Sequence, residues 1–311
     1  MICETPYYDI KTDCYFPCGK CIPCRVKRKM EWVTRVTLEA DKHDLKAYVT
    51  LTLDDENLIY GGTEQPTLYP KDLTDFIKRL RRKYEYNGFD TKIRYFACGE
   101  YGDEKKRPHY HLILLGIGEN HADIIRSCWN KGIVDIKPVK KGAIEYVAGY
   151  CVKKATELKA FYKEKQVEPE FFRSSLGMGR HIVKDVIQAV KTHNMPDVPR
   201  YVMRGKKKFY LTRYWIKKIR EACYTEAYCV ALTTALLSLV REKMREDIAN
   251  NVLASSIYDN ACNSCNYDLK KYFMRQLYET LYKDTIRANM LKYSQFLAKR
   301  NRLCQKEVNL T

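Results

Sequence analysis

The chain has 311 residues, 45% of them hydrophobic, which is enough apolar sequence for one large or two moderate domains and excludes a disordered tail. Lys and Arg (56) outnumber Asp and Glu (38), and the formal net charge of +18 favours a polyanionic partner, above all nucleic acid. The longest uncharged apolar stretch, residues 228–240, is too short to span a bilayer, so no membrane association is expected.

The amino-terminal segment is rich in cysteine and in basic residues. Four cysteines lie close together at positions Cys14, Cys18, Cys21 and Cys24. A Cys-x2-Cys step brings two sulfurs onto one ion, so a Zn²⁺ site is one interpretation, which Cys262 and Cys265 could complete; free thiols are the other. Three basic residues that follow are expected to contact DNA phosphates: Arg25, Lys27 and Arg28.

The cysteines indicate a reducing compartment. Residues 1–6 lack the basic start and apolar run of a secretory signal, and the 13 cysteines are odd in number. We therefore expect reduced thiols in a cytosol and no disulfide framework.

Hydrophobic periodicity predicts an alternation of helices and strands in the first half of the chain. Helices are expected at about 31–44, 70–84, 121–129 and 143–154, and strands at 47–53, 91–100, 107–115 and 132–138. This order predicts an α+β fold with helices against an antiparallel sheet.

The texture changes after residue 154. Residues 171–180 resemble a small-residue basic loop that ends at Arg180, and residues 200–208 are strongly cationic. From about 211 the sequence is mostly helical, with amphipathic stretches near 211–248 and 268–303. We therefore expect three parts, a Cys-rich basic segment at 1–30, a core domain at 31–200 and a helical region at 201–311.

The most informative pattern is a pair of histidines in the strand 107–115. His109 and His111 stand at i and i+2, so they point to one face and can hold one divalent metal through neutral ring nitrogens. If the strand 91–100 is the antiparallel neighbour, Glu100 lies within reach of both. Two imidazoles and a carboxylate suit Mg²⁺ or Mn²⁺ better than a structural zinc.

A second pattern follows in the helix predicted at 143–154. Tyr146, Tyr150 and Lys153 would share one face of it. Tyrosine, with a free pKa of about 10, is a weak nucleophile and needs charge stabilisation from a metal-bound phosphate and a cation such as Lys153. Attack on phosphorus would form a phosphotyrosine ester, and a second tyrosine one turn away would allow two sequential transesterifications.

These motifs, in this order, resemble those of the HUH-type rolling-circle replication initiators, most closely the initiators of the gokushovirus group of microviruses. The resemblance rests on residues 48–53, on Arg107–His111 and on Tyr146–Lys153, and also on the Cys-rich residues 17–25. It covers about residues 14–205. The family normally has a bulky apolar residue at Tyr110, a position that a tyrosine can fill with its hydroxyl at the edge of the core.

The resemblance implies an HUH endonuclease core, which is a ferredoxin- or RRM-like antiparallel sheet with helices. It also implies a metal-dependent endonuclease with strand-transfer activity in the cytoplasm of a host bacterium. The protein would nick supercoiled phage DNA at the origin, stay covalently on the 5′ end, leave a 3′-OH primer for the host polymerase and rejoin a single-stranded circle. Arg107 and Arg180 are further expected DNA contacts.

Two alternatives remain open from the sequence. One is a non-enzymatic nucleic-acid-binding protein with a zinc knuckle, supported by the cysteines and the charge. The other is an HUH transposase or relaxase, although a single-tyrosine transposase would not need both Tyr146 and Tyr150, and a relaxase more often has its tyrosine near the N-terminus. The C-terminal helices could bind duplex origin DNA, a host helicase or another copy of the protein.

Overall fold

The computed structural model describes residues 3–62, 64–102, 105–140, 142–153 and 159–308, with the side chains of 150–153, 159–161 and 289–308 outside the description. The chain forms two compact units. We call residues 28–223 the sheet unit, and residues 1–27 together with 224–311 the helical unit.

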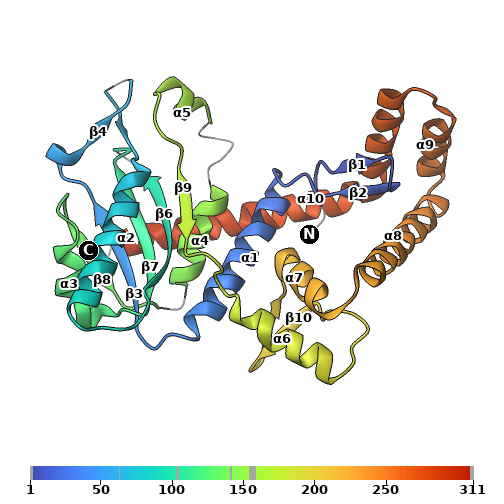
Figure 1. The fold of residues 1–311 in the computed structure, drawn as a ribbon. Coiled ribbons are helices and arrows are strands. Elements are labelled where there is room, and N and C mark those ends of the chain that lie inside the picture. Colours follow the sequence, from blue (N-terminus) through green and yellow to red (C-terminus); the bar gives the residue numbers. More distant parts are fainter. Residues whose placement is uncertain (1–2, 63, 103–104, 141, 154–158, 309–311) are drawn as a thin grey trace. The chain divides into compact units, whose positions relative to one another are not determined.

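The sheet unit is built on a five-stranded antiparallel sheet in the order β8-β3-β7-β6-β9 (Figure 1). Its strands are β3 Lys46–Thr52, β6 Arg94–Tyr101, β7 Pro108–Leu115, β8 Val134–Lys137 and β9 Phe171–Ser174. Its helices are α1 Ile22–Ala40, which begins in the helical unit, α2 Pro70–Tyr86, α3 Ala122–Ser127, α4 Ala143–Lys153, α5 Lys159–Glu164, α6 His181–Thr192 and α7 Arg213–Cys223. Short 3-10 turns span Asp55–Asn57 and Glu119–His121, and two hairpins pair β4 Ile59–Tyr60 with β5 Pro66–Thr67 and β10 Tyr201–Arg204 with β11 Lys207–Tyr210. The expected α+β fold is confirmed.

Local sequence explains the elements of this core. Alternate positions of β3 are fully buried and apolar, namely Ala47, Val49 and Leu51. The intervening Tyr48, Thr50 and Thr52 point to the opposite face. Helix α2 begins at Pro70, whose fixed φ and missing N–H suit a first helical turn. Its buried apolar positions recur with helical spacing at Leu73, Phe76, Ile77, Leu80 and Tyr84.

Both faces of the sheet are covered by apolar clusters. One cluster joins α2 and Trp129 to one face of the central strands, including Tyr110 and Leu112. The other joins α1 and α4 to the opposite face through Val33, Val36, Ala40, Val147, Ala148, Phe96, Ile113 and Leu115. Because β7 is covered on both sides, its sequence is an almost continuous apolar run, interrupted on the α1/α4 face by the two histidines.

The prediction of a loop over 171–180 is wrong in its first part. Phe171–Ser174 forms the edge strand β9, which pairs with β6 so that Phe96 lies opposite Ser174. A four-residue edge strand depends on its partner more than on its own pattern, and this is why the sequence did not reveal it. The rest is a turn in which Gly179 has a φ of +72°, and a Cβ there would lie 2.7 Å from the Trp215 ring.

The unit boundaries differ from the expected boundaries at 30 and 200. Helix α7 belongs to the sheet unit because Trp215 and Ile219 are fully buried. Residues 1–27 are not a separate segment, because they pack with the C-terminal helices. Helix α6 lies in the interval where only a boundary was expected, and α1 begins at Ile22, well before residue 31.

The helical unit contains β1 Tyr7–Asp9, β2 Cys14–Phe16, α8 Glu226–Ala249, α9 Val252–Asn263 and α10 Tyr267–Val308. Its core combines the start of the chain with these helices through Tyr8, Met244, Ile248, Ala254, Ala261, Met274 and Leu277. Caps explain why the helical sequence breaks where it does. The Thr225 hydroxyl accepts a hydrogen bond from the Tyr228 N–H, and the Asn251 side chain accepts one from the Ala254 N–H. Among the described residues, no helix is both long and apolar enough to cross a membrane.

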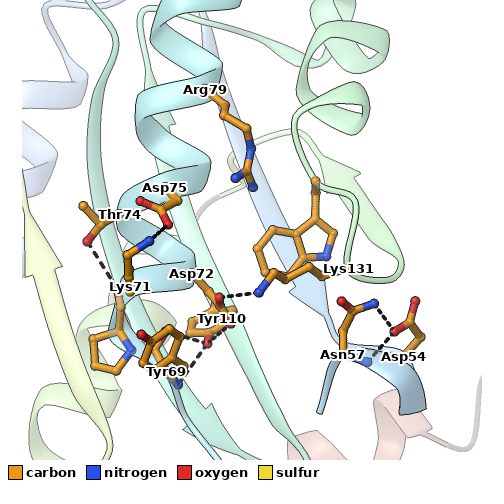
Figure 2. Close-up of polar contacts among 12 residues, drawn as sticks. Asp54, Asn57, Tyr69, Lys71, Asp72, Thr74, Asp75, Arg79, Tyr110 and Lys131 are labelled. Atoms are coloured by element: carbon orange, nitrogen blue, oxygen red, sulfur yellow. Dashed lines mark hydrogen bonds and ion pairs between the residues drawn. The ribbon is translucent and has the colours of Figure 1, made fainter. Parts of the chain in front are cut away.

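The tyrosine between the two histidines anchors the sheet to α2 (Figure 2). Tyr110 is fully buried, and its hydroxyl lies 3.1 Å from the Tyr69 carbonyl oxygen and 3.3 Å from an Asp72 carboxylate oxygen. It also accepts a hydrogen bond from the Tyr69 N–H. Asp72 is held in turn by the Lys131 ammonium at 2.7 Å. Burial, with the nearby Asp72 charge, raises the pKa of Tyr110, so this hydroxyl stays protonated and can donate.

We expect Tyr110→Phe to lower the free energy of unfolding by about 1–2 kcal/mol, because the buried Tyr69 N–H and the Asp72 carboxylate lose a partner. Urea unfolding measures the change. Tyr86→Phe is the matched control, since Tyr86 is 90% exposed on the same helix that Tyr110 contacts. A loss for Tyr110→Phe no larger than that of the control would contradict the anchoring role.

Candidate active site

Three potential ligands meet on the α1/α4 face of the sheet. His109 and His111 come from β7, and Glu100 lies directly opposite His109 on β6. The Nε2 atoms of His109 and His111 lie 2.7 and 2.9 Å from the same oxygen of Glu100, Oε1. Glu100 and His111 are buried, and His109 is half-buried. The antiparallel register therefore brings together the three residues that the sequence suggested would meet.

The other nitrogen of each imidazole is held by an oxygen atom. His109 Nδ1 lies 3.2 Å from the Arg107 carbonyl oxygen. His111 Nδ1 lies 2.8 Å from the Tyr48 hydroxyl and 3.0 Å from the Thr50 hydroxyl, and the Tyr48 ring stacks on His111 at 10°. When Nδ1 carries the proton and donates it to these oxygens, both Nε2 lone pairs point toward Glu100. Such outer partners orient histidines that bind metals.

The electrostatics of the group keep Glu100 ionised. Burial raises the pKa of its carboxyl, but hydrogen bonds from His109 and His111 outweigh burial and lower it to about 2. Burial lowers the pKa of His109, and the Glu100 carboxylate more than compensates, so the net pKa is raised. A buried anion is thus maintained next to two imidazoles, which is the charge pattern that a divalent cation complements.

The donor set fits a small divalent metal. One carboxylate and two imidazoles, each with a single ligand atom, lie within 4.8 Å of one another. Mixed oxygen and nitrogen donors without thiolate suit Mg²⁺ or Mn²⁺ and differ from the thiolate-rich sets of structural zinc. Glu100, His109 and His111 are therefore the residues that would hold such an ion.

Helix α4 brings a tyrosine to the same place. Val147 and Ala148 are fully buried and fix α4 against the sheet. Tyr146 stays 37% exposed, and its ring centre lies 5.5 Å from that of His111. Tyr150 and Lys153 continue the same helix, and their side chains lie outside the described part of the structure.

These groups share one open cleft of about 390 Å³. Its lining consists of Thr50, Thr52, Leu53, Arg107, Pro108, His109, His111 and Tyr146. Arg107 is ion-paired with Asp55 and donates a hydrogen bond of 2.7 Å to the Leu53 carbonyl, which orients its guanidinium at this cleft. The cleft thus combines a cation, a candidate metal group and a phenol, the parts needed to bind and attack a phosphodiester.

The other predicted DNA contacts lie on the surface. Lys27 and Arg28 are exposed on α1, and Arg25 is half-buried in the same helix. Arg180 is exposed just before α6. The structure brings Arg107, out of the five predicted basic residues, into the cleft with the histidines.

The cysteine group differs from the predicted one by one member. The sulfurs of Cys3, Cys18, Cys21 and Cys24 lie within 4.8 Å of one another. Cys14 is instead buried in β2, where its thiol lies 4.0 Å from the Leu237 carbonyl oxygen. Cys262 and Cys265 are exposed and do not belong to the group.

The sequence interpretation missed the positioning roles of Tyr48 and Thr50, and it missed Cys3. The alternation of β3 places Tyr48 and Thr50 on one face, so the signal was present. Its meaning depends on the pairing of Thr50 with His111, which no sequence pattern states. Cys3 is separated from Cys18 by a strand pair, and only the folding of β1 onto β2 brings it back.

Comparison with known proteins agrees with this region of the chain. A family model of replication-associated proteins, named for the ORF2 type, matches residues 46–155, which run from β3 to the end of α4 and include the histidine and tyrosine motifs. Replication-associated protein ORF2 of Spiroplasma virus 4 is 30% identical over 255 residues, which cover 76% of this chain and 75% of that protein.

Two further phage proteins are similar over about half of the chain. Replication-associated protein VP4 of Bdellovibrio phage phiMH2K is 34% identical over 158 residues, 45% of this chain and 48% of that protein. Replication-associated protein ORF4 of Chlamydia phage 1 is 32% identical over 168 residues, 48% of this chain and 41% of that protein. No solved structure matches the chain.

The fold, the site and these matches define a replication protein. More particularly, the chain belongs to the family of phage replication-associated proteins, which confirms the resemblance to microvirus rolling-circle initiators drawn from the motifs.

We expect the Tyr48→Phe/Thr50→Val double variant to bind Mn²⁺ about 10- to 100-fold more weakly, because His111 Nδ1 loses both oxygen partners. The Tyr48→Phe single variant should lose less, since Thr50 remains. Isothermal titration with Mn²⁺ measures both affinities.

Thr52→Val is the matched control for this prediction. Thr52 lies on the same strand and face, but its hydroxyl bonds to the backbone of Ile133. Wild-type Mn²⁺ affinity in the double variant would contradict the assigned role of Tyr48 and Thr50.

Proposed function

We propose that this protein initiates rolling-circle replication by cutting one strand of the phage origin with a tyrosine. The observation that carries the proposal is the presence of Tyr146 in one cleft with Glu100, His109 and His111. Similarity to phage replication-associated proteins supports origin DNA, single-stranded or supercoiled, as the substrate. The host bacterial cytoplasm is the compartment in which such a protein would act.

The chemistry is a transesterification at phosphorus. The phenolic oxygen of a tyrosine forms a bond to the scissile phosphorus, and the bond from phosphorus to the 3′-oxygen breaks. The phenolic proton is lost and the leaving 3′-oxygen gains a proton, so the products are a 5′-phosphotyrosine ester and a free 3′-OH. A Mg²⁺ or Mn²⁺ ion bound to the site would polarise the phosphate and stabilise charge on its oxygens.

Two tyrosines would allow the reaction to be repeated without dissociation. The 3′-OH serves as a primer for the host polymerase, and a second phenol attacks the regenerated origin. The new 3′-OH then attacks the first phosphotyrosine and closes a unit-length circle. We assign these two roles to Tyr146 and Tyr150, and assign charge stabilisation to Lys153, because they follow one another at helical spacing on α4.

Binding of DNA rests on phosphate contacts by basic residues. The net charge of +18 supplies the attraction, and Arg107 lines the cleft where the scissile phosphate would lie. We assign further phosphate contacts to the exposed basic residues Lys27, Arg28 and Arg180, and to Arg25. The hairpin β10–β11 adds a cationic ribbon with exposed tyrosines, in which Lys208 lies 4.7 Å from the ring centre of Tyr201.

We expect incubation of the protein with a labelled single-stranded origin oligonucleotide and Mn²⁺ to yield a covalent DNA–peptide adduct on Tyr146 or Tyr150. A denaturing gel detects the adduct, and peptide mass spectrometry locates it. Tyr146→Phe and Tyr150→Phe should each block completed rounds more strongly than the first nick, since one phenol remains. Tyr86→Phe, at an exposed position on α2, is the matched control.

The outcomes of this experiment separate the possible activities. Cleavage without an adduct would show a hydrolytic metal nuclease. Intact DNA binding with no cleavage of any origin strand would favour a non-enzymatic binding protein. Full nicking and rejoining by both Tyr→Phe variants would refute the tyrosine mechanism. Recircularisation of single strands from supercoiled DNA would distinguish an initiator from a transposase.

We expect His109→Ala to reduce cleavage roughly a thousandfold, equivalent to about 4 kcal/mol, while origin-DNA affinity stays close to wild type. The reason is that affinity depends on Lys and Arg contacts to phosphates, and the imidazole acts on the metal. His193→Ala, at the exposed end of α6, is the control. Fluorescence anisotropy in parallel with the cleavage assay tests this, and an equal loss of binding would make His109 a structural residue.

A further inference from the structure

Four thiols converge in the helical unit, away from any role in the proposed cleavage reaction. The sulfurs of Cys3, Cys18, Cys21 and Cys24 lie within 4.8 Å of one another, and those of Cys3 and Cys21 are 3.6 Å apart. All four are free thiols. A tetrahedral zinc with Zn–S bonds of about 2.3 Å places its sulfurs about 3.8 Å apart. The group therefore has the size of a four-thiolate zinc site.

Backbone N–H groups already point at three of these sulfurs. Cys18 Sγ accepts from the N–H of Lys20 and of Cys21, at 3.4 and 3.3 Å. Cys3 Sγ accepts from the Cys18 N–H at 3.3 Å, and Cys21 Sγ accepts from the Glu4 N–H at 3.5 Å. Donors of this kind stabilise negative charge on sulfur, and outer hydrogen bonds orient metal ligands. They are an observation independent of the clustering of the thiols.

The turn between the first two thiols requires a glycine. Gly19 has a φ of +72°, a conformation that other residues rarely adopt, and it lets the chain return so that Cys18 and Cys21 face one point. Cys24 follows in the first turn of α1. The arrangement is a Cys-x2-Cys turn followed by a helical cysteine, which is closed by a distant cysteine near the start of the chain.

We propose that Cys3, Cys18, Cys21 and Cys24 bind one Zn²⁺ ion as a closed structural site that fastens the start of the chain to helix α10. The fastening is visible in one contact. The Cys3 carbonyl accepts a hydrogen bond of 2.7 Å from the hydroxyl of Tyr278, which is a buried residue of α10. Zinc binding releases the thiol protons and adds stability only to the folded state.

Metal analysis of the full-length protein tests the proposal with Cys14 as the matched comparison. The measurement uses a His109→Ala/His111→Ala parent, so that the candidate active site contributes no metal and the test is independent of the proposed cleavage. After reconstitution with Zn²⁺ under reducing conditions and desalting, we expect about one zinc per chain in the parent and in Cys14→Ser. We expect almost none in Cys3→Ser.

Two results would overturn the assignment. One is loss of zinc from Cys14→Ser with retention in Cys3→Ser, which would restore the four sequential cysteines as the ligands. The other is a parent that holds no zinc, or that carries a Cys3–Cys21 disulfide under reducing conditions. A Cys262→Ser/Cys265→Ser variant serves as a further control, because both thiols are exposed and outside the group.

A second measurement needs no variant of the cluster and covers the case in which Cys3→Ser fails to fold. Zinc-loaded parent protein is alkylated, digested and analysed by mass spectrometry, before and after a chelator. We expect Cys3, Cys18, Cys21 and Cys24 to become reactive together only after chelation, while Cys262 and Cys265 react from the start. Reaction of the four thiols at unrelated rates, unaffected by the chelator, would contradict a shared ion.

Discussion

The pairing of β6 with β7 places Glu100 directly opposite His109, and two apolar layers hold that register. A slip of one residue would turn both histidines into the layer that contains α2 and would bring Tyr110 to the cleft. The alternation of β7 thus sets two roles at once. Its odd-numbered histidines face the site, and Tyr110 between them ties the opposite face to Asp72 and, through it, to Lys131.

The site depends on this frame because its groups are costly to bury singly. Glu100 is an anion in an apolar layer, and it is stabilised by two imidazoles whose far nitrogens have oxygen partners. Removing one partner leaves the others misdirected, so the cluster acts as a unit. Helix α4 is fixed by Val147 and Ala148, and Tyr146 is the part of that surface left open to a substrate.

The helical unit follows a different logic, because its core joins the two ends of the chain. Tyr8 and Tyr15 from the first strands pack with Met274 and Tyr278 of α10, and the Tyr15 hydroxyl donates to the Met274 carbonyl at 2.5 Å. A short amino-terminal segment has little apolar surface of its own. Attachment through tyrosines, and through the zinc that we propose, compensates for this small core.

The sequence by itself determined the elements of the core, the face shared by His109 and His111, and the family, because strand and helix periods and motif order are local properties. It also suggested that Glu100 would be near, since a short linker favours a hairpin. Only the tertiary structure decided that Tyr48 and Thr50 hold His111, that residues 171–174 complete the sheet and that Cys3 replaces Cys14 in the thiol group. Each of these depends on which distant segments pair, and such pairing is fixed by packing across the whole unit.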